Sequence, residues 1–183
     1  MEKKTDNSHL VEKIRLRFDT LALINKDEIL VLECFAGDGI IWEHVRQFSN
    51  KSIRILRIDA KPDKKGVYLK GDNLKFLNDM DLSMFDIIDL DAYGSPYKQL
   101  EHVFKSTFRG YVHCTYRQVG MGMIDHGMLK SIGYTGSMIK KIPTLFSSNP
   151  IEKMKQYLSV RNISSVTGYF FPRKNYFYFK INA

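Results

Sequence analysis

Residues 29–39 read Ile-Leu-Val-Leu-Glu-Cys-Phe-Ala-Gly-Asp-Gly, an apolar run that passes directly into a glycine-containing turn. The run Ile29–Leu32 is apolar at every position, which is typical of a strand buried on both faces of a parallel sheet. Gly37 and Gly39 allow the backbone to approach a ligand closely. A helix pattern then extends from Gly39 to Phe48. This strand–turn–helix unit predicts an α/β fold with a ligand-binding turn after its first strand.

The same alternation continues along the chain. The sequence predicts further strands at 53–58, 67–69, 85–90 and 111–116, and helices at 8–25, 73–78, 97–108 and 150–158. Strands that alternate with helices favour βαβ units, and right-handed crossovers then give a doubly wound, mostly parallel sheet. The chain of 183 residues is expected to form a single domain, 1–183.

Two segments depart from this alternation. Residues 165–171 and 176–181 are β-rich and flank Pro172-Arg173-Lys174-Asn175, so we expect a closing antiparallel hairpin. We interpret its many aromatic side chains as hairpin core in preference to a base-stacking platform. The glycine-rich stretch 117–150 is either a substrate loop or a poorly packed connector, and its lysines slightly favour the loop.

Charge is unevenly distributed between the two halves of the chain. The net charge is +8 overall, but residues 1–97 carry −2 and residues 98–183 carry +10. Such an asymmetry favours a nucleic-acid partner for the carboxy-terminal half over a merely solvated basic surface. The residues that we expect to contact this substrate are Lys140, Lys141, Arg173 and Lys174.

The sequence gives little sign of export, membrane insertion or metal binding. Residues 1–8 are charged and polar, and no stretch approaches the roughly 18 apolar residues of a membrane span. Cys34 and Cys114 lie outside any CxxC or histidine-rich cluster, and the five histidines show no ligand spacing. We therefore expect a cytoplasmic protein with reduced cysteines, no metal and no membrane association.

The first strand and its turn have the features of a nucleotide site. The helix after Gly39 offers N–H groups at its start, and Asp59 ends the second strand 20 residues later. A carboxylate at that position can accept both hydroxyls of a ribose. The third glycine of a dinucleotide motif would fall at Trp42, and no Gly-Lys-Ser/Thr follows, so a ligand without pyrophosphate fits better.

The most informative segment for chemistry is residues 85–96. An apolar strand leads into Asp91, and the chain then turns through Gly94 and Pro96. Ligands of open α/β sheets bind beyond the carboxyl ends of the strands, so Asp91 and Tyr93 lie where chemistry is expected. Asp89 precedes Asp91 by two positions and shares its face of the strand.

These residue types suit chemistry at an exocyclic base amine, whose lone pair is delocalised into the ring. Asp91 could accept one amine N–H and favour proton loss, the Ala92 carbonyl could accept the other, and Tyr93 could stack on the base. Asp89 could instead be a buried structural carboxylate, and Tyr93 could pack in the core. The catalytic candidates are thus Asp89, Asp91, Ala92 and Tyr93.

Glu33–Gly39 resembles motif I of class I S-adenosylmethionine (SAM)-dependent methyltransferases, an acidic residue followed by x-Phe-x-Gly-x-Gly. The resemblance spans about residues 28–181, because the closing hairpin also matches that family. It implies SAM as cofactor, with Glu33 and the turn at its methionine part and Asp59 at its ribose. Asp72 lies where the family often binds the adenine amine, or it caps the next helix. The implied cofactor-binding residues are Glu33, Phe35, Ala36, Gly37, Asp38, Gly39, Asp59, Ala60, Asp72 and Asn73.

Residues 89–96, Asp-Leu-Asp-Ala-Tyr-Gly-Ser-Pro, resemble motif IV of nucleic-acid amino-methyltransferases. They are most similar to the Asp-x-Asp-Pro-Phe/Tyr-Gly-Ser-Pro run of tRNA guanine-N2 dimethyltransferases. Ala92 stands where that family has proline, which keeps the carbonyl acceptor but loses the fixed φ. The chain is much shorter than those enzymes.

The sequence therefore predicts a SAM-dependent methyltransferase of an exocyclic base amine, with RNA favoured over DNA and a possible protein partner for recognition. One alternative is a small-molecule or protein methyltransferase on the same fold, since a fold does not fix a substrate. Another is a methyltransferase-like module that binds nucleic acid without catalysis.

Overall fold

In a computed structural model of the chain, the described residues are 9–60, 68–117, 125–142, 149–172 and 174–182. The strands are β1 (Glu28–Glu33), β2 (Ser52–Asp59), β3 (Tyr68–Lys70), β4 (Ile87–Leu90), β5 (Gly110–Arg117), β6 (Thr167–Phe170) and β7 (Lys174–Ile181). The helices are α1 (Leu10–Leu23), α2 (Ile40–Phe48), α3 (Asn73–Asp79), α4 (Tyr97–Lys105), α5 (His126–Ser131), α6 (Gly136–Lys141) and α7 (Pro150–Ser159), with a short 3₁₀ turn at Leu82–Met84.

The strands form one seven-stranded sheet in the order β3-β2-β1-β4-β5-β7-β6. The five strands from β1 to β5 run parallel, whereas β7 is antiparallel to β5 and to β6. The predicted doubly wound sheet with a closing hairpin is therefore confirmed. The long register of β7 along β5, from Lys174 opposite Arg117 to Ile181 opposite Gly110, fixes the hairpin to the sheet.

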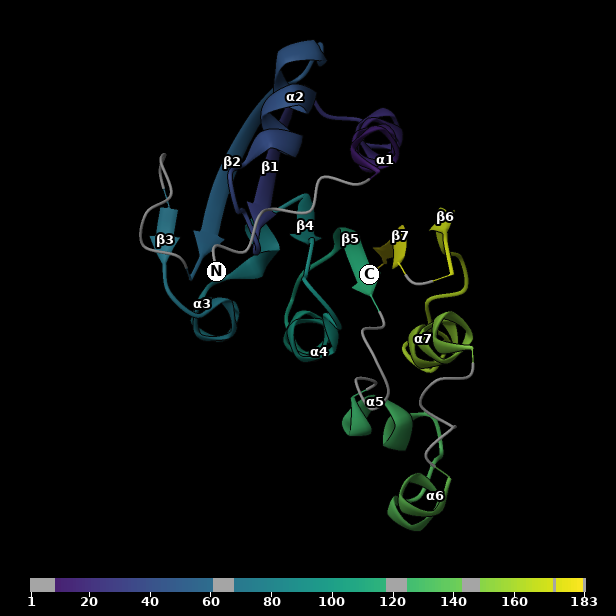
Figure 1. Cartoon of the computed structure of the whole chain (residues 1–183). Coiled ribbons are helices and arrows are strands. Elements are labelled where there is room, and N and C mark those ends of the chain that lie inside the picture. Colours follow the sequence, from purple (N-terminus) through teal and green to yellow (C-terminus); the bar gives the residue numbers. More distant parts are fainter. Residues whose placement is uncertain (1–8, 61–67, 118–124, 143–148, 173, 183) are drawn as a thin grey trace, which may run out of the picture.

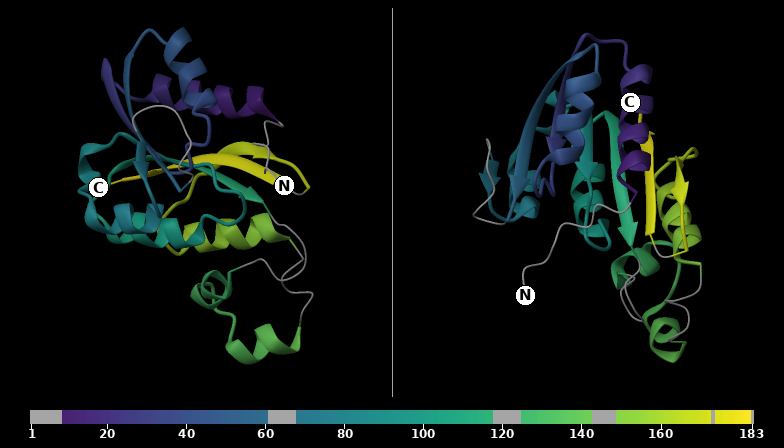
Figure 2. Two further views of the ribbon diagram at one scale, coloured as in Figure 1. Left: turned by 60° about the vertical axis from the view of Figure 1, so that its left-hand side comes forward. Right: turned by 45° about the horizontal axis from the view of Figure 1, so that its top comes forward.

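Helices cover both faces of this sheet (Figures 1 and 2). On one face α1 and α2 enclose a core that includes Leu16, Trp42 and Val45. On the other face α3, α4 and α7 enclose a larger core that includes Leu100 and Tyr157. The β1 side chains explain this arrangement, because a strand that is apolar at consecutive positions must be covered on both sides.

Several predicted boundaries differ from the structure. The helix expected over 97–108 ends at Lys105, because the backbone of Ser106 is extended and its hydroxyl donates to the Val103 carbonyl. The stretch 117–150 contains α5 and α6, with Met128 and Leu129 buried, so its described part is not a structureless connector. Ser8, at which the predicted first helix begins, lies outside the described residues.

Helix α1, predicted over 8–25, is amphipathic, but it buries more than its apolar stripe. Leu21 is buried and Ile14 and Phe18 pack against the core, while Lys13 and Arg17 on the neighbouring stripe are also buried. The hairpin aromatics predicted as core are confirmed on β7, where Phe177 and Phe179 are each 1% exposed, but not at Phe170 of the edge strand β6, which is 43% exposed. Within the described ranges, no helix has the length and hydrophobicity needed to cross a membrane.

Candidate active site

The glycine turn after β1 is anchored to the strands on both sides of it. The Cys34 N–H donates to the Asp89 carbonyl at 2.9 Å, and the Ala36 N–H donates to the Ile58 carbonyl at 3.2 Å. Gly37 and Gly39 then adopt φ values of 54° and 68°, which are costly for residues with a Cβ. The turn is thus held at the carboxyl edge of the sheet, where α2 begins.

Asp59 supports this turn directly. Its Oδ2 accepts a hydrogen bond of 2.7 Å from the Gly37 N–H, at the end of the neighbouring strand β2. The carboxylate predicted for ribose binding therefore lies beside the glycine turn. Of the other predicted cofactor residues nearby, Asp38 and Ala60 are exposed, Phe35 is half-buried and Ala36 is buried.

An arginine that the sequence analysis did not single out lies under the same turn. Arg57 donates to Glu33 at 2.9 Å and to Glu43 at 2.6 Å, and so joins β1, β2 and α2. A Cβ on Gly39 would lie 3.0 Å from its guanidinium carbon. Burial and the nearby Asp89 raise the pKa of Glu33 to about 8, against the opposing effect of Arg57. Glu33 therefore pairs with Arg57, which lies next to Gly39 of the turn, and the contact of Glu33 with a cofactor stays a prediction.

The start of α3 adds two polar groups to this edge. Asp72 caps the helix by accepting from the Leu74 N–H at 3.0 Å, which is one of the two roles considered for it. Asn73 is buried, donates to the Cys34 carbonyl at 2.8 Å and accepts from Gln99 at 2.9 Å. Asn73 therefore ties α3 and α4 to the glycine turn.

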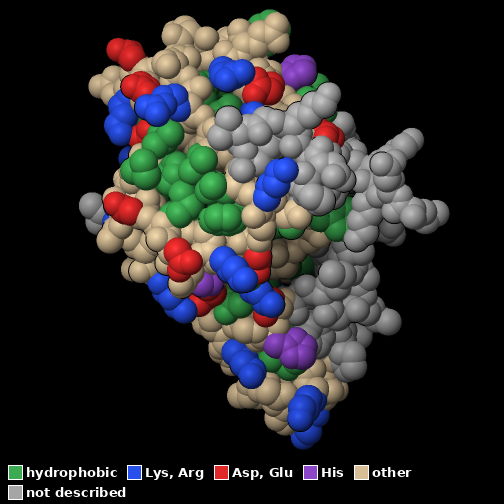
Figure 3. All heavy atoms as spheres, turned by 90° about the vertical axis from the view of Figure 1, so that its left-hand side faces the viewer, with side chains coloured by type: hydrophobic (Ala, Val, Ile, Leu, Met, Phe, Trp, Pro, Cys, Tyr) green, Lys and Arg blue, Asp and Glu red, His purple; other side chains and the backbone are tan. Residues whose placement is uncertain are grey.

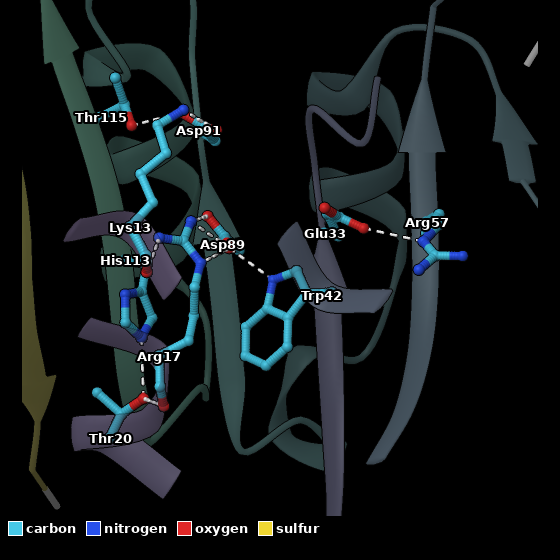
Figure 4. Close-up of polar contacts among 10 residues, drawn as sticks. All are labelled: Lys13, Arg17, Thr20, Glu33, Trp42, Arg57, Asp89, Asp91, His113 and Thr115. Atoms are coloured by element: carbon cyan, nitrogen blue, oxygen red, sulfur yellow. Dashed lines mark hydrogen bonds and ion pairs between the residues drawn. The ribbon is translucent and has the colours of Figure 1, made fainter. Parts of the chain in front are cut away.

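Asp89 is a structural carboxylate, one of the two roles left open by its sequence. Its side chain is 1% exposed and receives the Arg17 guanidinium in a bidentate pair, with N···O distances of 2.7 to 3.0 Å. The Trp42 indole N–H donates to the same carboxylate at 2.6 Å (Figure 4). One buried charge thus connects β4, α1 and α2.

Asp91 follows β4 and contacts α1, as Asp89 does. The two aspartates therefore lie on the same face, as their spacing predicted. Lys13 Nζ lies 2.5 Å from Oδ2 of Asp91, and the Thr115 hydroxyl donates to Oδ1 (Figure 4). Burial would raise the pKa of Asp91, but Lys13 and Arg17 outweigh it, and the pKa lies below its usual value. The carboxylate is 17% exposed, so it is held in place while still reaching the surface.

The residues after Asp91 change from buried to exposed within one step. Ala92 is buried, whereas the Tyr93 side chain is 66% exposed, so Tyr93 is not core packing. Gly94 has φ 148°, and the chain then enters α4 at Tyr97. An exposed aromatic residue therefore follows the fixed carboxylate by two positions at the carboxyl end of the sheet.

The predicted substrate-binding lysines lie on two separate elements. Lys140 and Lys141 are exposed on α6, which extends beyond the carboxyl end of β5 with α5 (Figures 1 and 2). Lys174 begins β7 and lies 5.2 Å from the Tyr176 ring centroid. Arg173 lies outside the described residues. The face on the β3 side mixes both signs of charge, and at its lower end the visible charged side chains are basic or histidine (Figure 3).

The comparisons with known proteins concern the fold. No family profile and no curated protein matches the chain. Among solved structures, the CurJ carbon methyltransferase aligns with 95% of this chain and 54% of its own, at 14% identity and a TM-score of 0.60. A SAM-dependent methyltransferase from Archaeoglobus fulgidus aligns over 93% of both chains, at 13% identity and a TM-score of 0.55.

A third similar structure is a candidate rRNA methylase from Clostridium thermocellum, which covers 93% of this chain and 97% of its own. Its identity is 12% and its TM-score is 0.52. The chain thus spans about half of the first of these structures and nearly all of the other two. At these identities the likeness concerns architecture alone. The chain has the Rossmann-like fold of class I methyltransferases.

Proposed function

We propose that this protein is a SAM-dependent methyltransferase that modifies an exocyclic amine of a nucleic-acid base, with RNA favoured over DNA. The observation that carries the proposal is the fixed Asp91 carboxylate beyond β4, followed two residues later by the exposed side chain of Tyr93. The carboxylate is fixed by two donors, and it follows the strand that neighbours β1, whose end carries the glycine turn. An amine acceptor and a stacking surface are the two groups that a flipped base requires.

The residues around the glycine turn suit SAM. Asp38, Asp59 and Asp72 place carboxylates at the turn, at the end of β2 and at the start of α3. These groups complement a cationic ligand that carries a ribose diol and an adenine amine, whereas they would repel a pyrophosphate. Asp59 is the expected ribose acceptor, and Ala60 and Asn73 are further expected cofactor contacts. SAM supplies an electrophilic methyl group when it is bound.

The mechanism assigned to the protein is positioning and proton acceptance. Asp91 accepts one N–H of the target amine, which orients the nitrogen lone pair, and the Ala92 carbonyl accepts the second. The Asp91 charge also favours proton loss as the nitrogen becomes positive. Tyr93 stacks on the base and holds it in the plane that these acceptors require.

A nucleic acid is the favoured substrate for two further reasons. Residues 98–183 carry a net charge of +10, and Lys140 and Lys141 extend it beyond the end of β5. The run 89–96 is similar to the motif of tRNA guanine-N2 dimethyltransferases, and one structural neighbour is a candidate rRNA methylase. Counterion release upon phosphate contact would make substrate binding depend steeply on salt.

The direct test is methyl transfer from labelled SAM to total RNA, DNA and protein in parallel. We expect label in RNA, and Asp91→Asn should lower turnover by roughly 10²–10⁴-fold while SAM affinity changes little. Asp27→Asn is a matched control, because Asp27 is exposed at the opposite end of the sheet, before β1. Label in protein, or in neither RNA nor DNA, would contradict the proposed substrate.

The cofactor has its own test, by calorimetric titration with SAM and with NAD. We expect SAM to bind and NAD not to bind. Asp59→Ala should weaken SAM binding by about 1.5–3 kcal/mol, the scale of a hydrogen bond to a charged group. Asp27→Ala should leave the affinity unchanged. NAD binding in the absence of SAM binding would overturn the assignment.

A further inference from the structure

Helix α1 buries a polar stripe whose members have different partners. Arg17 pairs with Asp89, and the Thr20 hydroxyl lies 3.0 Å from His113 Nε2 on β5. These contacts, with the apolar side chains of α1, already join the helix to the sheet. Lys13 lies one helical turn before Arg17 and reaches a different group, the Asp91 carboxylate.

The buried surroundings of Lys13 make it an energetically costly choice if its purpose is only to hold α1 against the sheet. Its side chain is 5% exposed, and burial lowers its pKa, an effect that Asp91 partly offsets. Its ammonium lies 5.2 Å from the Tyr176 ring centroid. Replacing a buried ion pair with well-packed apolar side chains is often neutral for stability or stabilising. We therefore infer that Lys13 acts on Asp91 and is not needed to hold α1 against the sheet.

Resting on the function proposed above, we propose that Lys13, together with Thr115, is a positioning residue that fixes the orientation and the charge of the Asp91 carboxylate. Lys13 engages Oδ2 and Thr115 engages Oδ1, so the carboxyl plane is set by two elements, α1 and β5. An ionised carboxylate offers about four lone-pair sites, so each oxygen can still accept an N–H from a target amine.

The charges around Asp91 explain why a cation is needed there. Asp89 lies two positions earlier on β4, and two carboxylates at this spacing disfavour each other's ionisation. Arg17 also lowers the pKa of Asp91, but its hydrogen bonds go to Asp89, so Lys13 is the cation that contacts the Asp91 carboxylate directly. From β7, Lys174 faces Lys13 and opposes its charge. Loss of Lys13 should therefore raise the pKa of Asp91, and a protonated Asp91 could not draw a proton from the amine.

The first test is a ¹³C NMR titration of carboxyl-labelled aspartate, with Asp91 assigned from Asp91→Asn. In Lys13→Met the Asp91 titration should move to higher pH, whereas Lys13→Arg should keep it low. If Lys13→Met does not fold, Thr115→Val removes the second donor at constant shape and should shift the same titration upward. The proposal would be overturned if the Asp91 titration midpoint is unchanged in Lys13→Met. If Lys13→Met does not fold, an unchanged midpoint in Thr115→Val would overturn it instead.

The second test is kinetic and separates this inference from the proposed function. Lys13→Met should lower kcat by on the order of 10²-fold, the scale of a misplaced catalytic group, at unchanged SAM affinity. Lys180→Met is a matched control, because Lys180 is exposed and also lies near a tyrosine ring, 5.6 Å from the Tyr111 centroid. An active wild type with an unaltered Lys13→Met pH–rate profile would refute the role of Lys13. A wild type without methyl transfer would instead contradict the proposed function, and the titration would still decide the role of Lys13.

Discussion

Removal of the Arg17 guanidinium should be among the most destabilising single changes in this protein. Asp89 is 1% exposed and accepts from Arg17 through Nε and Nη2. Arg17→Met would leave this carboxylate buried with the Trp42 N–H as its remaining described donor. Breaking a buried pair in this way costs about 3–5 kcal/mol. At about 2–4 °C per kcal/mol for a chain of this size, the melting temperature should fall by roughly 6–20 °C.

The assay can use the single tryptophan of the chain, because Trp42 is buried and bonded to the same carboxylate. Denaturant unfolding followed by Trp42 fluorescence and by circular dichroism gives the free energy of unfolding of the wild type, Arg17→Met, Asp89→Leu and the double variant. The double variant should be more stable than the sum of the single losses predicts, because it buries no uncompensated charge. A loss below about 1 kcal/mol in Arg17→Met, or strict additivity, would refute the reasoning.

Three smaller perturbations test other parts of the structure. Gly39→Ala should cost about 1–2 kcal/mol for its left-handed φ and should weaken SAM binding, because the new Cβ meets Arg57; calorimetry and unfolding check both. Burial holds the pKa of His113 well below its usual value, so only the unfolded chain gains a proton there as the pH falls below about 6.5; stability should drop by up to ~1.4 kcal/mol per pH unit. His113→Gln should remove this slope, and His44→Gln, at an exposed site, should retain it. Tyr116→Phe should leave thermal stability equal or raise it by about 1 kcal/mol, because the buried Tyr116 hydroxyl has no partner among the described residues.

The sheet could be predicted from the sequence because its parallel strands are short stretches rich in apolar residues, separated by turns and helix patterns. The glycine turn and Asp59 were likewise predictable, since the ends of neighbouring parallel strands meet at one edge. The helices α5 and α6 were missed because each has only six residues and their stretch contains several glycines, which weaken a helix pattern. Their few buried side chains, Met128, Leu129 and Ile139, supply the tertiary packing that local propensity does not show.

The cations at the site were missed for a different reason. On an amphipathic helix, lysine and arginine are normally assigned to the solvent face, so Lys13 and Arg17 gave no signal by themselves. Arg57 was overlooked in a similar way, because a charged residue within a strand gives no signal by itself. A usable signal existed in the pairing of two aspartates, because carboxylates two apart at the end of a buried strand require compensating charges.

Simple geometry shows how the helix meets that requirement. Residues four apart on a helix are separated by about 6 Å along its axis, and residues two apart on a strand by about 6.6 Å. Lys13 and Arg17 therefore match the spacing of Asp91 and Asp89, with α1 running against the direction of β4. The two pairs differ in exposure, since Asp89 is enclosed and Asp91 reaches the surface. Substitutions at Arg17 should therefore change mainly stability, whereas substitutions at Lys13 should change mainly the chemistry of Asp91, although one helical turn separates the two residues.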